Sequence, residues 1–206
     1  MIKIGITGGI GCGKTTIVKK FIDLGIKAYM LDDRSKHLVN TNQNLRNDLI
    51  DMFGREVFNT DGSYNTKLVS DIVFKLDDKT DLIELTNLFG KYINDDYKLF
   101  LTENKDEDYV VVESAYFFEY DMLDMLHWVD FILGIETSLS NRIERVKLRN
   151  PNLSEDEIIK RINAQMDQEE KMNYCDFVLN NDNKVEDNEI MKMDTLFRKL
   201  NGASVQ

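Results

Sequence analysis

The feature that most constrains this chain is a glycine-rich motif close to its first residue. Residues 8–15 read G-G-I-G-C-G-K-T and match the pattern G-x-x-x-x-G-K-[ST]. Alternating isoleucines, Ile2, Ile4 and Ile6, lead into the motif, and apolar residues at helical spacing follow it. A strand, a glycine loop and a helix in this order predict a phosphate-binding loop. The alternative is a glycine-rich turn from strand to helix that binds no ligand.

The residue types in this segment suit a bound polyphosphate. Phosphate oxygens must approach backbone N–H groups, so side chains have to be absent where the loop wraps them. The start of the next helix adds unpaired N–H donors and the positive end of the helix dipole. Lys14 would place its charge near the β- and γ-phosphates, and the Thr15 hydroxyl would hold Mg²⁺. We therefore predict a nucleoside triphosphate site, and we call residues 8–16 the phosphate loop.

Composition limits the partners of this site. The 206 residues suit one domain with an insertion. Because 26 Lys and Arg stand against 37 Asp and Glu, the net charge is −11, which argues against general affinity for a nucleic acid polymer. The chain has no apolar run of about 18 residues and opens directly into a strand, so we expect neither a membrane span nor a signal peptide. Cys12 and Cys175 lack disulfide or metal spacing, so we expect a reduced, cytoplasmic setting.

A second apolar run, residues 26–31, predicts a strand that ends in two acids, Asp32 and Asp33. Ligands of open parallel sheets gather at the carboxyl ends of the strands, so such an acid would face the same crevice as the phosphate loop. It could accept the proton of an attacking hydroxyl or help to organise Mg²⁺. Equally, the acids could cap the helix predicted through residues 36–39.

The segment from about residue 40 to residue 105 is predicted to be helical. Apolar faces at helical spacing occupy residues 45–53, 68–76 and 82–101, and residues 60–63 carry a turn signal. Such a stretch between two strands exceeds an ordinary crossover. We expect a helical insertion that could form the pocket for a phosphoryl acceptor, with a purely structural insertion as the alternative.

A third strand, residues 109–113, is buried and ends in Glu113. An acid after an apolar strand is the usual context of a residue that organises Mg²⁺ or its water. A fourth strand is predicted at residues 129–135.

The helix after the fourth strand is unusually basic for an acidic protein. Its basic residues are Arg142, Arg145, Lys147 and Arg149. Arg145 and Arg149 share a helix face, and a capping box at residues 154–157 opens another helix that carries Arg161. Two such helices resemble a lid that closes over phosphates, where arginine neutralises the charge of the transferred group. Ordinary surface ion pairing is the alternative, and spacing alone favours it for any single arginine.

Together these motifs resemble the dephospho-coenzyme A kinase family. Residues 4–16, followed by Leu24-Gly25 and the acidic strand end, carry the resemblance. Family members usually have Asp-Ala-Asp at that strand end, and the second Asp is the proposed base. An ungapped alignment places this base on Asp32, with Met30 in place of the first acid, whereas a shift by one residue would choose Asp33.

The resemblance extends through the insertion, with two departures. Residues 53–57 and 61–65 match the family pattern, but Asn65 or Thr66 stands where the family commonly has Arg. The family's His-Pro pair is absent, and residues 87–90 lie near its place. These departures bear on the identity of the acceptor more than on phosphoryl transfer.

Further matches follow in the second half of the chain. Residues 114–119 resemble the family's P-L-L-F-E segment, which suggests that Phe118 and Glu119 line the acceptor site, although aromatic clusters at strand ends are more often core. The lid arginines and Gln165 fall on the family's R, R, R-I-x-A-Q pattern, and residues 175–181 resemble its last strand.

The resemblance implies an α/β fold, the three-layer P-loop kinase fold with a five-stranded parallel sheet. Its core would comprise residues 1–35, 108–140 and 173–206, with a helical acceptor-binding insertion at 36–107 and a lid at 141–172.

The implied reaction moves the γ-phosphoryl group of ATP, with Mg²⁺, to the ribose 3′-hydroxyl of dephospho-coenzyme A, giving coenzyme A and ADP. The implied catalytic residues are Asp32, Lys14 and Arg145, with Thr15 as the metal ligand. The residues implied for ATP are Gly9, Ile10, Gly11, Cys12, Gly13, Lys14, Thr15, Thr16, Arg145 and Arg149. Those implied for the acceptor are Asp33, Glu113, Phe118, Glu119 and Arg161.

Two other functions stay open at this point. A nucleoside or deoxynucleoside monophosphate kinase on the same fold is the first alternative, and a non-catalytic nucleotide-binding module is the second. In each case the partners are small molecules, with no nucleic acid polymer and no membrane. The oligomeric state is left open.

Overall fold

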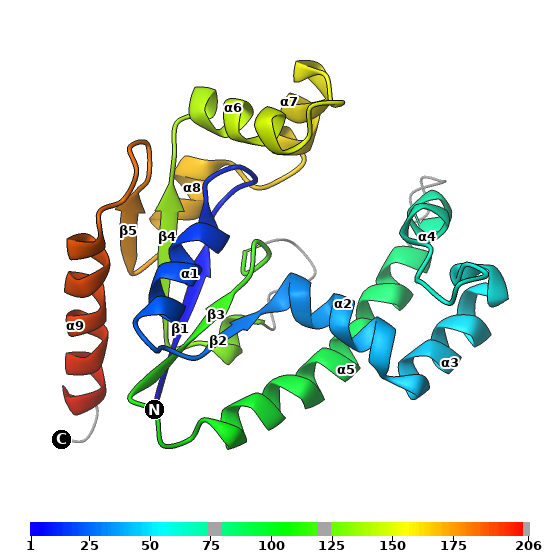
Figure 1. The fold of residues 1–206 in the computed structure, drawn as a ribbon, viewed down its shortest axis with the longest axis horizontal. Helices are drawn as coiled ribbons and strands as arrows, with labels where there is room; N and C mark the ends of the chain where they lie inside the picture. The colour runs from blue at the N-terminus through cyan, green and yellow to red at the C-terminus, as the bar shows by residue number, and fades with distance from the viewer. Residues whose placement is uncertain (74–79, 119–124, 204–206) are drawn as a thin grey trace. The chain divides into compact units, whose positions relative to one another are not determined.

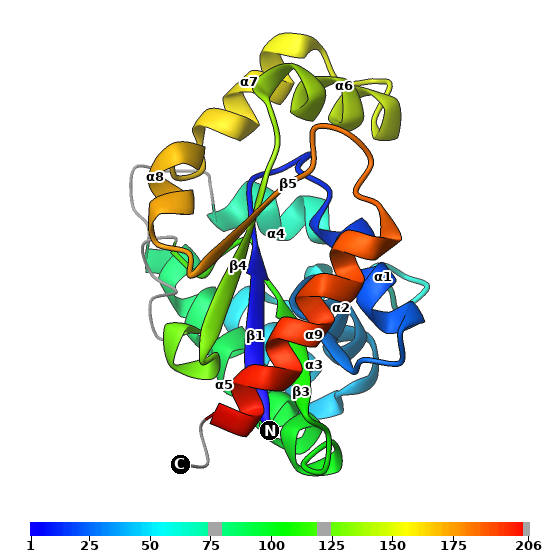
Figure 2. The same ribbon diagram turned by 90° about the vertical axis from the view of Figure 1, so that its left-hand side faces the viewer.

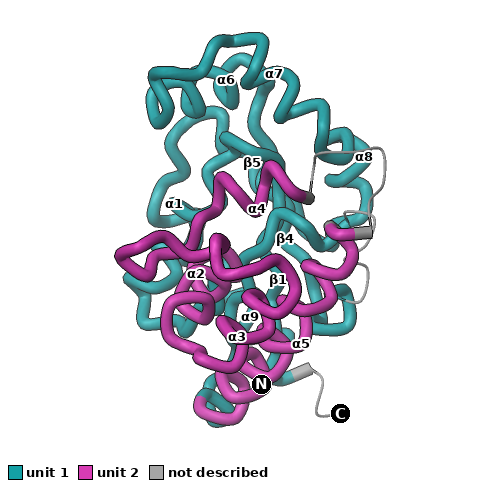
Figure 3. Tube along the Cα trace, turned by 90° about the vertical axis from the view of Figure 1, so that its right-hand side faces the viewer, with its two compact units in different colours: residues 1–30, 104–206 teal, residues 31–103 magenta. Residues whose placement is uncertain are grey.

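The fold is a parallel sheet between helices. The structure, a computed structural model, describes residues 1–73, 80–118 and 125–203 (Figure 1). Within these residues the chain divides into two compact units, one of residues 1–30 and 104–206 and the other of residues 31–103 (Figure 3).

The first unit holds the sheet. The described strands are β1 (Ile2–Thr7), β2 (Ala28–Met30), β3 (Tyr109–Glu113), β4 (Phe131–Glu136) and β5 (Phe177–Asn180). They form a five-stranded, all-parallel sheet in the order β2-β3-β1-β4-β5. This confirms the predicted sheet. In an all-parallel sheet all strands end at the same edge, so the segments that follow β1, β4 and β5 meet there.

Helices cover both faces of this sheet, namely α1 (Lys14–Asp23), α8 (Gln168–Asn173) and α9 (Asp187–Ala203). Two more helices, α6 (Leu139–Arg149) and α7 (Glu155–Asn163), lie beyond the carboxyl ends of the strands (Figure 2). In Figure 2 the strands run between α8 on one side and the pair α1 and α9 on the other. This arrangement gives the three layers that the sequence predicted.

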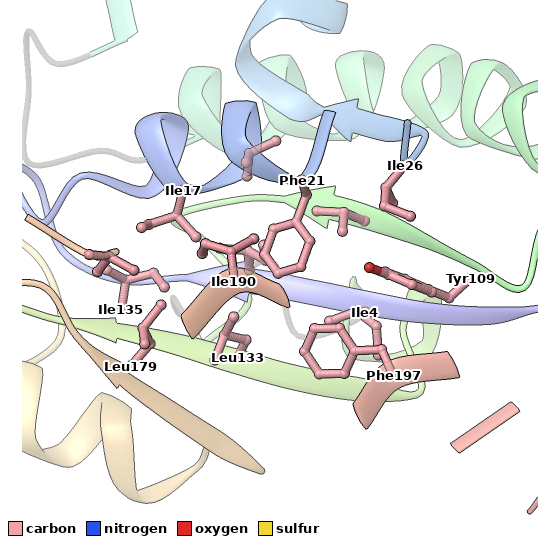
Figure 4. Close-up of a cluster of buried hydrophobic side chains, with 14 of the residues drawn as sticks. Ile4, Ile17, Phe21, Ile26, Tyr109, Leu133, Ile135, Leu179, Ile190 and Phe197 are labelled. Carbon is pink, nitrogen blue, oxygen red and sulfur yellow. The ribbon is translucent and has the colours of Figure 1, made fainter. Parts of the chain in front are cut away.

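The main core lies between the sheet and the pair α1 and α9. Ile4 alternates with residues of the opposite face and packs with Phe21 of α1 and Phe197 of α9 (Figure 4). The two phenylalanine rings stack at 6.0 Å between centroids, and the Tyr109 ring meets Phe197 edge-on at 5.5 Å. Each such buried aromatic contributes about 2–3 kcal/mol of transfer free energy, so these contacts hold α1, and with it the phosphate loop, on the sheet.

The opposite face of β1 carries Gly5 and Thr7. A Cβ atom on Gly5 would lie 3.1 Å from the Phe117 ring, so the small residue lets the segment after β3 pack close to the sheet. Phe117 itself is fully buried.

The second unit is built from helices. They are α2 (Leu31–Thr41), α3 (Gln43–Phe53), α4 (Thr66–Val73) and α5 (Thr80–Glu103), with a 3₁₀ turn η1 (Arg55–Val57). The predicted helical faces at residues 45–53 and 82–101 are confirmed, and the predicted face at 68–76 is confirmed to Val73, beyond which it lies outside the described residues. The Asn42 side chain caps α3 by accepting from Leu45 N at 3.1 Å.

Side-chain contacts tie these helices to one another. Arg34 of α2 binds the Asp96 carboxylate of α5 through two guanidinium nitrogens. The Tyr92 hydroxyl of α5 donates to the Asp48 carboxylate of α3 at 2.6 Å. Burial, with this bond to Asp48, raises the pKa of Tyr92 to about 12, so the phenol stays a donor throughout the neutral range.

The second predicted strand was too long. Residues 26–31 were expected to be extended, but β2 covers only Ala28–Met30 and α2 begins at Leu31. Asp32 and Asp33 therefore lie in the first turn of a helix and not at a strand end. Acids in a first turn are stabilised by the positive end of the helix dipole, which explains why the helix begins before them.

Candidate active site

The phosphate loop joins the end of β1 to the start of α1 and follows the predicted path. Gly11 and Gly13 have φ values of 83° and 91°, a region that L-residues with side chains rarely adopt. A Cβ atom on Gly11 would lie 2.6 Å from the Arg142 carbonyl oxygen. Both glycines are therefore required by backbone conformation, and Gly11 also by close packing against α6.

Lys14, the first residue of α1, turns its side chain back over the loop. Its ammonium donates to the Gly8 carbonyl at 2.9 Å and to the Gly9 carbonyl at 3.4 Å. These bonds hold a positive charge against the loop backbone, in the place where the sequence predicted a phosphate-binding lysine.

The start of α1 offers further groups for an anion. The helix has no side-chain cap, and its first turn contains no acidic residue. Thr15 and Thr16 lie exposed in this turn. The Thr16 N–H already donates to the Gly13 carbonyl at 3.0 Å. The N–H groups before it have no partner within a helix, so this end of α1 can donate to a phosphate.

The Cys12 carbonyl anchors the loop to the sheet. It accepts hydrogen bonds from the Asn181 amide at 2.7 Å, the Thr137 hydroxyl at 3.1 Å and the Arg145 guanidinium at 3.5 Å. Thr137 follows β4 and Asn181 follows β5, so two strand ends hold the same carbonyl. The Cys12 side chain is fully buried, which makes this residue a packing element of the loop.

Arg145 links the loop to the end of β5. Its guanidinium also donates to the Asn181 carbonyl at 2.7 Å and to the Asp182 carbonyl at 3.3 Å. The Asp182 carboxylate accepts from Ser138 N at 2.7 Å and from the Asn141 amide at 2.9 Å. These bonds, above all those from Ser138, lower the pKa of Asp182 to about 2 and fix the start of α6.

Residues of α6, and Gln165 just after α7, hold the phosphate loop through hydrogen bonds to Ile10. Gln165, which follows α7, accepts from Ile10 N at 2.7 Å, and Arg142 Nε of α6 donates to the Ile10 carbonyl at 2.9 Å. The Ile10 side chain packs against a small cluster formed by Val146, Ile158 and Ile162. Both backbone groups and the side chain of Ile10 are therefore held by the predicted lid.

Known proteins that resemble the chain point to one family. A family model described as dephospho-CoA kinase matches residues 2–187. The chain belongs to the dephospho-CoA kinase family. The dephospho-CoA kinase of Bacteroides fragilis (strain YCH46) is 33% identical over 181 residues, covering 88% of this chain and 85% of that protein. That of Dehalococcoides mccartyi is 32% identical over 187 residues, covering 89% and 90%.

Solved structures show the same fold. The crystal structure of TT1252 from Thermus thermophilus has a TM-score of 0.77 and 26% identity, and the match covers 95% of this chain and 96% of that one. The dephospho-CoA kinase from Campylobacter jejuni has a TM-score of 0.64 at 24% identity, covering 97% and 98%, and shares the fold.

The resemblance to the dephospho-CoA kinase family assigned four further residues, all of which are exposed. Arg149 is exposed in the last turn of α6, and Arg161 is exposed on α7. Asp32 and Asp33 are exposed in the first turn of α2, in the helical unit. The assigned roles of these four residues stay predictions.

The residues assigned after β3 have different surroundings. Glu113 is buried at the end of β3, in register with Ile6. Phe118 is buried, and its ring lies 5.5 Å from that of Tyr174. Glu119 lies outside the described residues.

Several loop contacts were missed from the sequence. Thr137 and Asn181 received no role, although each is a polar residue directly after a strand of a parallel sheet, which is the signal that singled out Glu113. Gln165 was recognised only as part of a family motif, and Arg142 only as one of several basic residues.

None of the described helices is long and apolar enough to cross a membrane.

Proposed function

We propose that this protein transfers the γ-phosphoryl group of ATP to the ribose 3′-hydroxyl of dephospho-coenzyme A, giving coenzyme A and ADP. The observation that carries the proposal is the Lys14 ammonium held on the loop carbonyls, in a chain whose residues 2–187 match the family model. This geometry supports a triphosphate in the loop, and family membership supports the acceptor.

The loop residues supply positioning and charge. Lys14 would neutralise phosphate oxygens, and the free N–H groups at the start of α1 would donate to them. Arg145, held by three backbone carbonyls, would face developing charge without having to reorganise. In the transfer, the bond between the γ-phosphorus and the bridging oxygen of the β-phosphate breaks as the 3′-oxygen bonds to phosphorus.

The residues also fit Mg²⁺ in its usual role. Among the described residues no group of three or more His, Cys, Asp or Glu side chains could hold a metal ion. Mg²⁺ is typically held by one or two protein oxygens together with substrate phosphates, so an all-protein cage is not needed. The exposed Thr15 hydroxyl at the start of α1 would be its protein ligand. When bound, Mg²⁺ supplies charge neutralisation on the β- and γ-phosphates.

The acceptor side is assigned as follows. Asp32 would take the proton of the attacking hydroxyl, with Asp33 as the alternative base. The acceptor-binding residues would be Asp33, Glu113, Phe118, Glu119 and Arg161. We assign acceptor binding to the helical segment at residues 36–107 and closure over the phosphates to the lid at residues 141–172. A cytoplasmic location and purely small-molecule partners stay predictions.

The deciding experiment offers the protein ATP and Mg²⁺ with one acceptor at a time. With dephospho-coenzyme A we expect ADP in a coupled assay and a product heavier by one phosphoryl group. Coenzyme A itself is the matched control, because its 3′-oxygen already carries phosphate, and we expect no ADP from it. Turnover of nucleoside monophosphates alone would instead support the first alternative function. ATP binding without transfer to any acceptor would support a nucleotide-binding module.

A further inference from the structure

Arg142 contacts the phosphate loop, and the function proposed above assigns it no role. It belongs to α6 and is only 5% exposed. Its Nε donates to the Ile10 carbonyl at 2.9 Å. The guanidinium packs closely against Gly9, because a Cβ atom added to Gly9 would lie 2.7 Å from Arg142 Cζ. The Lys14 ammonium also contacts Gly9, because it donates to the Gly9 carbonyl at 3.4 Å.

The charge of Arg142 is buried without a neutralising partner. Among the described residues no carboxylate lies within 4.0 Å of it, and the one hydrogen bond of its side chain is to the Ile10 carbonyl. Two groups act on it through space, Cys12 and then Asp167, and the Asp167 carboxylate already caps α8 by accepting from two backbone N–H groups. Burial lowers the pKa of Arg142, the direction expected for a cation removed from water.

A shortage of acidic residues does not explain why Arg142 lacks a carboxylate partner. The chain has 37 Asp and Glu residues, and other cations of the sheet unit bind them: Lys3 pairs with Asp130 and Arg198 with Asp108. A buried charge is costly unless it is paired, so an unpaired one next to an anion site indicates that the partner is supplied from outside.

We infer that Arg142 is a further nucleotide-binding residue, whose buried charge is compensated by the triphosphate held in the phosphate loop. The inference rests on the proposed function in requiring that a triphosphate binds there. A guanidinium has five N–H donors, and Arg142 spends one on Ile10, so the remaining four are available toward the loop and its ligand. Arg142 would contact the phosphates from α6, and Lys14 would contact them from α1.

This inference predicts the opposite change in stability from a merely structural role. If Arg142 only held Ile10 in place, removing it would lower the thermal midpoint of the free protein. If its charge is instead neutralised only by a bound ligand, the free protein bears the cost of an unpaired, desolvated cation. Removing the charge then leaves the thermal midpoint of the free protein unchanged or raises it, while nucleotide affinity falls.

The test compares Arg142→Met with wild type. Methionine keeps an unbranched apolar chain of similar length and removes the charge. We expect an unchanged or higher thermal midpoint without nucleotide, and ATP binding weaker by about 10- to 100-fold by calorimetry. Binding of adenosine, which has no phosphates, should not change. Lys147→Met is the matched control, because it removes an exposed charge from the same helix, and its ATP affinity should stay within about twofold of wild type.

Three results would overturn the inference. One is a lower midpoint with unchanged ATP affinity, which makes Arg142 structural. Another is an equal loss of ATP and adenosine affinity, which indicates a general disturbance. The third concerns Arg142→Lys, which keeps the charge and is measured in parallel in case the methionine variant does not fold. It should bind ATP within about tenfold of wild type, and a loss of about 100-fold would contradict a role for the charge. Failure of the proposed function is separate, because wild type would then bind ATP without phosphorylating dephospho-coenzyme A.

Discussion

The cations around the phosphate loop differ from a cation of the helical unit in what they contact. Lys14, Arg142 and Arg145 donate to backbone carbonyls, and among the described residues none has a carboxylate within 4.0 Å. Arg34 of the helical unit is bound by the Asp96 carboxylate through two nitrogens. A carbonyl oxygen orients a cation but leaves its positive charge in place. A carboxylate orients the cation and also neutralises its charge. We therefore infer that the charges of the loop cations are available to a ligand, whereas the charge of Arg34 is neutralised where α2 meets α5.

The largest effect should come from the loop side of this comparison. Lys14→Met removes the ammonium that lies on the Gly8 and Gly9 carbonyls. We expect kcat/KM for ATP to fall about 10³-fold, or about 4 kcal/mol, because the charge acts on the transferred phosphoryl group. Steady-state kinetics measure this. Lys19→Met, which changes an exposed lysine on the same helix, is the control. If Lys14→Met lowered kcat/KM for ATP by less than about tenfold, the proposed difference between the loop cations and Arg34 would be wrong.

A smaller loss should follow from changing the predicted base in the helical unit. Asp32→Asn keeps the shape of the side chain but cannot take a proton. We expect kcat to fall about 10²-fold while the ATP dissociation constant does not change. Asp33→Asn, its neighbour in the same exposed first turn, should lose less kcat and act mainly on the acceptor KM. The reverse order of the two variants would move the base to Asp33.

The smallest effect should appear where a cation is already neutralised. Asp96→Asn breaks the pair with Arg34, of which the Asp96 side chain is 9% and the Arg34 side chain 39% exposed. Because the pair is partly solvated, we expect a loss of about 1–2 kcal/mol and a thermal midpoint lower by about 2–6 °C. ATP affinity should stay within about twofold of wild type. Asp95→Asn is the exposed control on the same helix, and a loss of ATP affinity in Asp96→Asn alone would show that Arg34 is not a purely structural cation.

Local features of the fold were predictable because they depend on near neighbours in the chain. The glycine motif fixed the phosphate loop, since only particular residues allow a strand to turn into a helix around an anion. The capping box at Ser154 and Glu157 is present as predicted, because it joins residues three apart. The boundary at Leu31 was misjudged, since an apolar run of that length does not distinguish a strand from the first turn of a helix.

The sequence by itself determined the loop, the parallel sheet and the family. Tertiary structure alone decided which side chains reach the loop. Asn181 bonds to Cys12 across 169 residues, and Arg142 reaches Ile10 across 132. Such contacts arise because all strands of a parallel sheet end at one edge, which brings together segments that no local spacing relates. For the same reason Arg142 and Arg149, alike in sequence as basic residues of one helix, differ in position: one is buried against the loop and the other lies in solvent.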